Sequence, residues 1–264
     1  MATTKKDVAK KNDAELPVPL EEFEGMEGQG FEDTDKDAYA IPFLRVLQSN
    51  SPQCNEDEDS YIKGAKPGMM FNTITGDLYG KEVEIIPVHY TRDFVEWRPN
   101  RGGFVQSHGS DPAILERVEK IDDKNNQILD NGNVIQDTRN HYILIADKLV
   151  DGPVIFSLNS TGVRHSRKWM TLLSNLVLPN STKKAPMFAG VWRVSTVQNE
   201  NDDGKWYQVG NKSMTAIEYV RWVNSRELDA ARGARKLITS GTTRADYDSL
   251  RDSDNKPKEE DIPF

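Results

Sequence analysis

The segment 90–104 combines flat aromatic rings with cationic side chains within fifteen residues. Its members are Tyr90, Arg92, Phe94, Trp97, Arg98, Arg101 and Phe104. Cations neutralise phosphates and rings stack on bases, so this combination is typical of a surface that binds a single nucleic-acid strand. Aromatic residues in a strand most often fill a core, which is the competing interpretation of each ring.

Two further basic clusters fit the same chemistry. Arg164, Arg167 and Lys168 lie in the first turns of a predicted helix, where cations oppose the helix dipole. Arg193, Trp206 and Tyr207 lie on predicted late strands. Surface cations at helix starts are common, so the charge alone does not establish a site. Together with the first segment, these residues form the predicted DNA-binding set.

Sequence patterns for enzymes are missing. The chain has no phosphate-binding loop, nucleophile elbow, zinc-protease helix or dinucleotide fingerprint. Asp93 and Glu96 leave a metal-dependent nuclease open as an alternative. The single Cys54 and four histidines without ligand spacing predict no metal site. We therefore expect no cofactor and no catalytic residues.

Charge is unevenly distributed along a chain whose net charge is −8. Residues 1–60 hold 6 Lys and Arg against 15 Asp and Glu, and residues 245–264 hold 3 against 7. The remainder, 61–244, has 25 basic and 20 acidic residues, so a mildly basic body lies between acidic ends. No apolar run is long enough to cross a bilayer and no signal peptide is present, so we expect a soluble, cytoplasmic protein.

These shifts in composition predict three parts. Residues 1–37 read as a disordered acidic arm, 38–240 as a folded domain, and 241–264 as a flexible acidic tail. Lys81 to Pro99 carries the longest strand signal. Alternation puts Tyr90 on one face with Ile86 and Val88, unless a bulge near Asp93 exchanges the later residues.

The remaining elements follow from turn and capping signals. Asp111-Pro112 opens a predicted short helix, and Asp151-Gly152 separates the two strands of a predicted hairpin. Predicted helices run from Ser160 or Thr161 to Leu176 and from Thr215 to Arg232, with predicted strands at Met187 to Val197 and Trp206 to Val209 between them. This order predicts a mainly β (α+β) fold, an OB-fold-like five-stranded Greek-key barrel elaborated with helices. An unrelated α+β sheet is the alternative.

The chain ends in an acidic run followed by Asp261, Ile262, Pro263 and Phe264. A ring presented with acids suits an apolar pocket with a basic rim. This tip resembles that of bacterial single-stranded DNA-binding proteins. The resemblance implies that these four residues recruit helicases, nucleases, primase, polymerase subunits or recombination mediators, while an OB-fold domain holds the DNA. It covers about six residues, and the family's short N-terminal domain and Gly/Gln/Pro-rich linker are not recognisable.

The body, with Pro42 to Pro52 and Gly64 to Gly68, resembles proteins of tailed bacteriophages. We therefore expect a phage-encoded, non-enzymatic single-stranded DNA-binding protein for replication, recombination or repair, and a homo-oligomer is compatible with this. A recombination annealing protein is one alternative. A second is an adaptor that mimics the host tail without binding DNA.

Overall fold

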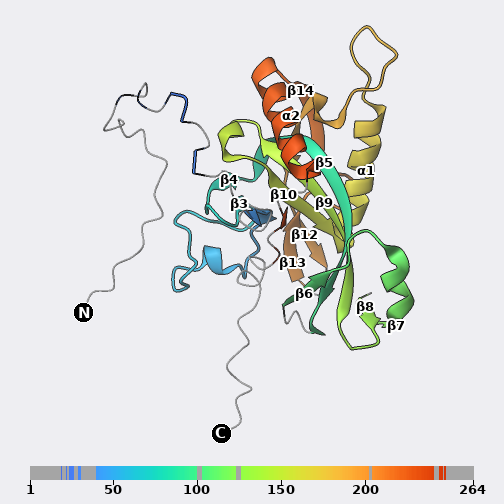
Figure 1. Ribbon diagram of the computed structural model, residues 1–264. Helices are drawn as coiled ribbons and strands as arrows, with labels where there is room; N and C mark the ends of the chain where they lie inside the picture. Colours follow the sequence, from blue (N-terminus) through green and yellow to red (C-terminus); the bar gives the residue numbers. More distant parts are fainter. Residues whose placement is uncertain are drawn as a thin grey trace, which may run out of the picture.

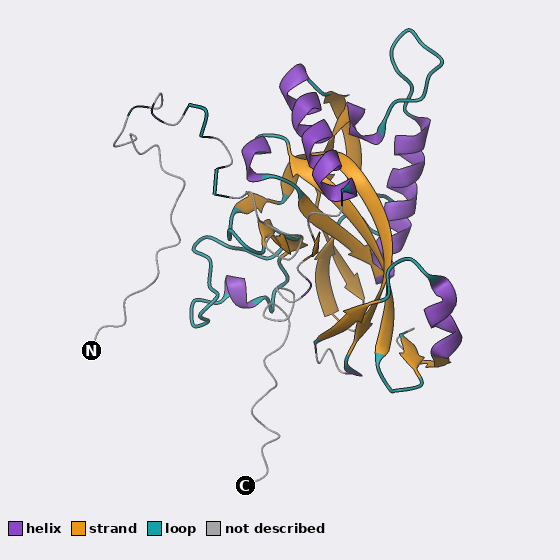
Figure 2. Cartoon of the chain, in the orientation of Figure 1, coloured by secondary structure: helices purple, strands orange, loops and turns teal. Residues whose placement is uncertain are grey.

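The computed structural model describes residues 40–99, 103–122, 126–201 and 204–240, together with 19, 22, 24–26, 29–30, 244–245 and 247. Strands dominate this body, and two α-helices pack against them (Figures 1 and 2). The described part of the chain is therefore mainly β with a smaller helical part, as predicted.

The strand β5 (Glu82–Trp97) forms the centre of the main sheet and confirms the long strand predicted from the sequence. Around it lie β9 (Val134–Ile145), β10 (Val154–Asn159), β11 (Gly190–Ser195), β14 (Ile217–Trp222) and β6 (Phe104–Ser107). On one side β5 pairs antiparallel with β9, which pairs with β10. On the other side it pairs with β11 and, further along, with β6, and β14 pairs with β11. The predicted hairpin around Gly152 is confirmed as β9 and β10, with a short 3-10 turn, η5 (Leu149–Asp151), between them.

The strands pair in the spatial order β10-β9-β5-β11-β14, and along the chain the helix Val163–Asn175 lies between β10 and β11, the third and fourth of these strands, as predicted. The fifth strand of this sheet is β14 and not the predicted strand Trp206 to Val209. The OB-fold itself is not confirmed. In the described residues β10 and β14 lie at opposite ends of this order, and no ladder joins them into a closed barrel. Within the same described part, no helix is long and apolar enough to span a membrane.

The helix α1 (Val163–Asn175) follows β10 through a 3-10 turn, η6 (Ser160–Gly162), and covers one face of the sheet. Trp169 and Leu173 are buried there against Ile85 of β5. The predicted Ser160 or Thr161 cap is wrong, because Gly162 occupies the N-cap position and makes no side-chain bond. Packing of the apolar stripe therefore positions this helix more than capping does.

The second helix, α2 (Ser225–Thr239), covers the opposite face. Ala231 and Ala234 are buried against Ile86 of β5. Asn224 and Glu227 form a reciprocal capping box, with bonds of 2.9 and 2.8 Å between side chain and backbone. The sheet thus carries one helix on each side.

The predicted helix from Thr215 to Arg232 is wrong in its first part. Residues Ile217–Trp222 form β14, because Ile, Tyr, Val and Trp favour an extended strand that pairs with β11. The capping box then starts α2 later, and Gly233 lies inside this helix instead of ending it. The predicted strand from Met187 begins with a 3-10 turn, η7 (Met187–Ala189), and continues as β11. The predicted strand from Trp206 is confirmed as part of β13 (Gly204–Gln208), which forms a hairpin with β12 (Val197–Asn201).

A β-bulge between Pro87 and His89 sets which residues of β5 face each helix. Before the bulge, Ile85 faces α1, and Ile86 and Val88 face α2. After it, Tyr90 lies on the α1 side, in ring contact with His141. The sequence left open a bulge near Asp93, whereas the structure has one earlier in the strand. Tyr90 therefore lies on the face opposite to Ile86 and Val88.

A small lobe closes the far end of β5. It contains η4 (Pro112–Arg117), β7 (Val118–Ile121) and β8 (Gln127–Leu129). The predicted helix start is confirmed as a 3-10 turn, since the Asp111 side chain accepts a bond from the backbone N–H of Ala113. The lobe is held by Glu96, whose buried carboxylate accepts hydrogen bonds of 2.5–3.2 Å from Asn131, Asn133, Gln106 and His108.

Two distant parts of the chain meet on the α2 side. The short strands β1 (Ala40–Ile41) and β15 (Arg244–Ala245) pair in parallel. Near them, η2 (Pro52–Cys54) and the sheet of β2 (Leu44–Val46), β3 (Met70–Asn72) and β4 (Leu78–Gly80) complete the body. Tyr247 is 8% exposed and stacks on Phe104 at 5.2 Å. Contacts with the body thus continue past residue 240, after which we placed the start of the tail.

Candidate nucleic-acid interface

Four polar side chains of β5 and β9 form a network on the α1 side of the sheet. Arg92 donates two hydrogen bonds, of 3.0 and 2.9 Å, to the carboxylate of Asp137. Arg139 donates to the same carboxylate at 2.7 Å and to the Tyr90 hydroxyl at 3.1 Å. Arg92 also lies over the ring of Phe94, at 4.5 Å from its centroid. Two cations share one carboxylate, so the network keeps a net positive charge.

The hydrogen bonds and charges of this network shift the pKa values of Asp137 and Arg92. Burial raises the pKa of Asp137, but the hydrogen bond from Arg92 and the charge of Arg139 outweigh it, so the pKa is lowered. The bond to Asp137 raises the pKa of Arg92. Asp137 and Arg92 are therefore both charged at neutral pH, and the side chain of Arg92 keeps 36% exposure for a ligand.

A buried histidine links this network to α1. The ring of His141 lies in tilted contact with Tyr90, at 5.1 Å between centroids, and with Trp169, at 4.5 Å. Its Nε2 is 2.8 Å from the Ser166 hydroxyl of α1. Burial and the charge of Arg139 lower the pKa of His141 to about 3, so the ring is neutral. The first turns of α1 are thereby fixed beside Tyr90.

Three predicted cations lie on the outer side of α1. Arg164, Arg167 and Lys168 are spaced i, i+3 and i+4, so they share one face, while His165 and Trp169 are buried. The sequence of α1 contains no acidic residue. We call Arg92, Arg139, Arg164, Arg167 and Lys168 the α1-side basic surface.

The strand β13, which carries Trp206, contacts the chain just before α1. Thr161, just before α1, donates a 2.7 Å hydrogen bond to the side chain of Gln208. Trp206 lies two residues from Gln208 on the same strand, so the two side chains share a face of the hairpin. Tyr90 and Trp206, both half-buried, are thus the predicted rings that the structure brings towards α1.

The other predicted rings lie elsewhere. Phe94 is fully buried among Ile114, Leu129 and Ile135. Trp97 and Phe104 pack on the α2 side with Tyr247. Tyr207 points away from Trp206 and packs under Lys81 and against Gly68, where a Cβ atom would lie 2.6 Å from its ring. Core packing, the competing interpretation, accounts for these four rings.

The remaining predicted residues also lie away from α1. Arg193 forms a 3.0 Å ion pair with Glu84 on β5. Arg98 is exposed beyond the end of β5. Arg101 and the tip residues lie outside the described part of the chain. The tip residues are Asp261, Ile262, Pro263 and Phe264.

The acids that suggested a nuclease do not share a site. Asp93 accepts bonds from Asn140 at 2.7 Å and from the Tyr247 hydroxyl at 2.9 Å, on the α2 side. Glu96 lies in the lobe, and hydrogen bonds from four side chains overcome its burial and lower its pKa to about 2. Among the described residues, no three His, Cys, Asp or Glu side chains are grouped to hold a metal ion.

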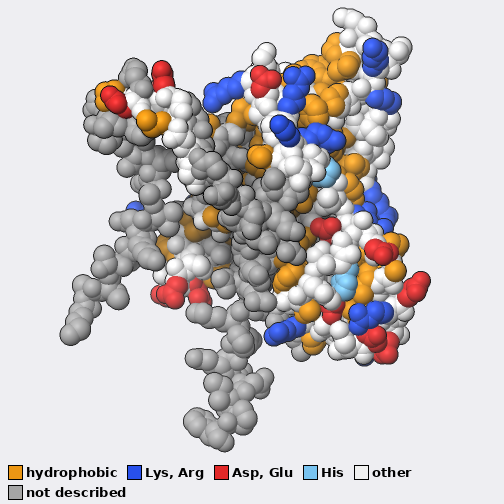
Figure 3. Space-filling model, viewed as in Figure 1, with side chains coloured by type: hydrophobic (Ala, Val, Ile, Leu, Met, Phe, Trp, Pro, Cys, Tyr) orange, Lys and Arg blue, Asp and Glu red, His pale blue; other side chains and the backbone are white. Residues whose placement is uncertain are grey.

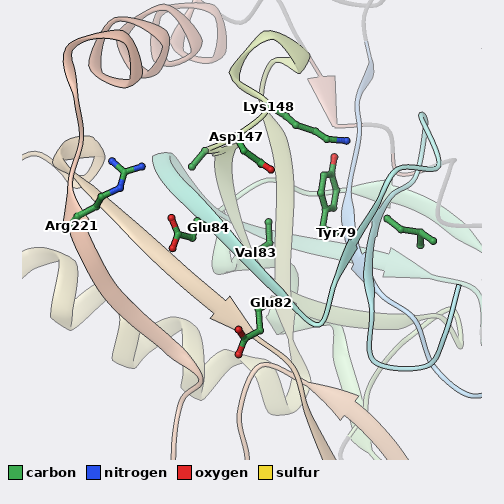
Figure 4. A pocket seen from close by; sticks show the side chains of 9 residues that line it. Tyr79, Glu82, Val83, Glu84, Asp147, Lys148 and Arg221 are labelled. Carbon is green, nitrogen blue, oxygen red and sulfur yellow. The ribbon is translucent and has the colours of Figure 1, made fainter. Parts of the chain in front are cut away.

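A pocket of about 400 Å³ opens on the α2 side, between β4, β5 and the turn after β9 (Figure 4). Three of its charged side chains form ion pairs with neighbours, and the other two, Glu82 and Asp147, are acidic. Lys148 forms an ion pair with Asp77 and Arg221 one with Glu227, while Glu84 holds Arg193. Because these charges are compensated internally, the pocket is a weaker candidate than the α1-side basic surface.

Sequence reasoning missed Arg139 and the cations of α2. Arg139 lies on β9, the first strand of the predicted hairpin, for which the apolar run that indicated it begins only at His141, whereas β9 begins at Val134. The exposed α2 cations Arg232, Arg235 and Lys236 lay at and beyond the predicted helix end. Charge spacing on a correctly bounded helix is the signal that would have found them.

Comparison with known proteins identifies the family. A family model described as Pam3 phage gp34-like protein matches residues 9–244. The search of curated proteins found no match, and the search of solved structures found none either. Since the matched region covers most of the sequence, including the sheet and both helices, the chain belongs to the family of Pam3 phage gp34-like proteins.

Proposed function

We propose that this phage protein binds single-stranded DNA through the α1-side basic surface, and that it does so without catalysis. The observation that carries the proposal is the grouping of Arg92 and Arg139 on the sheet with three exposed or half-buried cations of α1, beside the rings of Tyr90 and Trp206. Cations track the phosphates, and the rings provide faces for bases.

Phosphate contacts supply most of this affinity. Only two of the predicted rings border the surface, and stacking contributes about 1–3 kcal/mol per base. Each phosphate contact lowers log Kobs by roughly 0.7 per decade of salt, so five bound cations predict a slope of about −3.5.

The experiment measures fluorescence anisotropy of labelled oligo(dT) with the full chain across a salt series, with duplex DNA of the same length as comparison. A variant with Arg167→Gln and Lys168→Gln removes two exposed cations of α1. Its matched control carries Lys183→Gln and Lys184→Gln in the loop after this helix, where both side chains are also exposed.

We expect oligo(dT) to bind more tightly than duplex, and the α1 variant to lose at least fivefold in affinity while the control stays within twofold. If the wild-type chain binds no oligonucleotide at low salt, the proposal is wrong and the tail-mimicking adaptor replaces it. If the two variants behave alike, the assigned surface is wrong.

We further propose that residues 259–264 recruit replication or recombination proteins of the bacterial host. Support comes from the resemblance of this acidic Asp-Ile-Pro-Phe segment to the tips of bacterial single-stranded DNA-binding proteins. Tyr247, the last residue that the structure describes, packs with Phe104 on the α2 side.

Competition with a bacterial tip peptide tests this second part. A peptide of residues 256–264 should displace the labelled bacterial tip from a purified helicase or nuclease that binds it. The same peptide with Phe264→Ala should compete at least tenfold less well, because the ring fills the apolar pocket. Equal competition by both peptides would remove this part of the proposal.

A further inference from the structure

The same basic pattern occurs on both helices. Residues 164–168 read Arg-His-Ser-Arg-Lys and residues 232–236 read Arg-Gly-Ala-Arg-Lys. Each is Arg-x-x-Arg-Lys, in which the three cations are spaced i, i+3 and i+4 and share one side of the helix. The proposed function uses only the first of these patterns.

The second pattern faces outwards. Ala231 and Ala234 of α2 are buried against the sheet, whereas Arg232, Arg235 and Lys236 are exposed. Figure 3 shows Lys and Arg side chains gathered over α2 in the upper part of the view. The acids of α2 offset this charge only in part. Glu227 is 3% exposed and is held by Arg221, and Asp229 forms an ion pair of 3.7 Å with Arg232. Arg235 donates a 3.4 Å hydrogen bond to the backbone carbonyl of Val88, which is neutral.

The two patterns lie on opposite faces of one sheet. Trp169 of α1 packs with Ile85, while Ala234 of α2 packs with Ile86, the next residue of β5. Successive strand residues point to opposite sides, so the body of the sheet separates the two groups of cations. One strand lying along α1 would leave the cations of α2 free for another.

The helix dipole does not explain the repetition. Cations near the C-terminal end of α2 are favourable, but Arg164 and Arg167 lie in the first turns of α1, where cations are unfavourable. A shared ligand chemistry accounts for both locations. The planar guanidinium of each Arg suits phosphate oxygens.

We propose that the outer face of α2, formed by Arg232, Arg235 and Lys236, binds the phosphate backbone of a second nucleic-acid strand. This inference rests on the proposed function and extends it from one strand to two. From Arg232 to Lys236 the helix rises about 6 Å, which spans roughly two phosphates of one strand. A chain with this arrangement holds two strands on opposite sides of its sheet.

Holding two strands brings them together at high local concentration. A protein that speeds the pairing of complementary strands needs to hold two strands close together. The α2 face therefore gives the annealing alternative a physical basis that the α1-side basic surface alone does not provide.

The test is a bridging assay with the full chain. Two oligo(dT) molecules, one carrying a donor dye and one an acceptor, cannot pair with each other, so energy transfer reports both strands on one complex. The α2 variant carries Arg232→Gln and Lys236→Gln, and the matched control again carries Lys183→Gln and Lys184→Gln. Circular dichroism and thermal unfolding first establish that both variants fold like wild type.

We expect wild type and control to give energy transfer. In the α2 variant the energy transfer should fall at least fivefold, while the affinity of this variant for the first strand changes less than twofold. Removing two phosphate contacts should also lower the salt slope of second-strand capture by about 1.4. Energy transfer that persists in the α2 variant overturns the inference. The inference is also overturned if wild type binds a single strand but gives no energy transfer, and in that case the proposed function still stands. If wild type binds no strand at all, both the inference and the proposed function are wrong.

Discussion

Acid should unfold this protein through two buried histidines. His141 and His165 are both 0% exposed. Burial, with the charge of Arg139, lowers the pKa of His141 to about 3. Burial, with the charges of Arg164 and Lys168, lowers that of His165 to about 4. Both rings therefore stay neutral in the folded state at pH values at which they bind protons in the unfolded chain.

The sign follows from which state binds the proton. A folded-state pKa below the unfolded value of about 6.5 means that the unfolded chain takes up protons first as pH falls. Stability is thus complete above about pH 6.5 and decreases below it. At pH 5 the loss is about 1.5 pH units at 1.36 kcal/mol each, or about 2 kcal/mol per histidine and about 4 kcal/mol for the pair.

Urea unfolding at pH 7.5, 6.5, 5.5 and 5.0, followed by tryptophan fluorescence, measures this loss. Trp169 contacts His141 directly and is a suitable probe. His141→Gln should halve the pH-dependent loss, because Gln does not titrate. Carboxylates such as Glu96, whose pKa is also lowered, contribute mainly below about pH 4.5. A free energy of unfolding that stays within 0.5 kcal/mol between pH 7.5 and 5 would refute the reasoning.

Three substitutions test the packing that positions the candidate interface. Glu96→Ala removes the shared acceptor of the lobe and leaves several buried donors unpaired, so we expect a loss of about 3 kcal/mol in urea unfolding, with Glu96→Gln milder. Asn224→Ala removes the capping box of α2 and should cost about 1 kcal/mol, measured in the same way; no change would show that packing alone sets the helix start. Tyr247→Phe leaves Asp93 and Asn140 short of one partner and should cost about 1–3 kcal/mol, with faster proteolysis of the C-terminal segment as the second readout. An unchanged cleavage rate would mean that Tyr247 does not hold that segment.

The sequence predicted those strands and turns that depend on the residue types of a short segment alone. The strand β5 is rich in β-branched and aromatic residues, and the turn before η4 has Asp111 as cap and Pro112 at the first position. Gly152, with φ 78°, occupies the left-handed conformation that the hairpin connection requires. Each of these depends on neighbouring residues alone, so one sequence is sufficient to find it.

The sequence did not predict contacts between residues that lie far apart in the chain, because these contacts depend on how the strands pair. Arg92 meets Arg139 only because β5 and β9 pair in one particular register. Tyr247 covers Phe104 from a segment that composition marked as tail. The bulge at Pro87 fixes which helix Tyr90 faces. Composition and spacing identify the basic and aromatic residues, whereas the register of the sheet decides which of them share a surface.

Photo-crosslinking tests the central claim most directly, because it locates the strand on the protein. The full chain would be irradiated with oligo(dT) containing a photoreactive thymine analogue, and the labelled peptides identified by mass spectrometry. We expect labels at Tyr90, Trp206 and the residues of α1, and loss of the α1 label when Arg167→Gln and Lys168→Gln are present. Labels confined to Arg98 or to Arg193, or no specific label, would contradict the assignment of the α1-side basic surface.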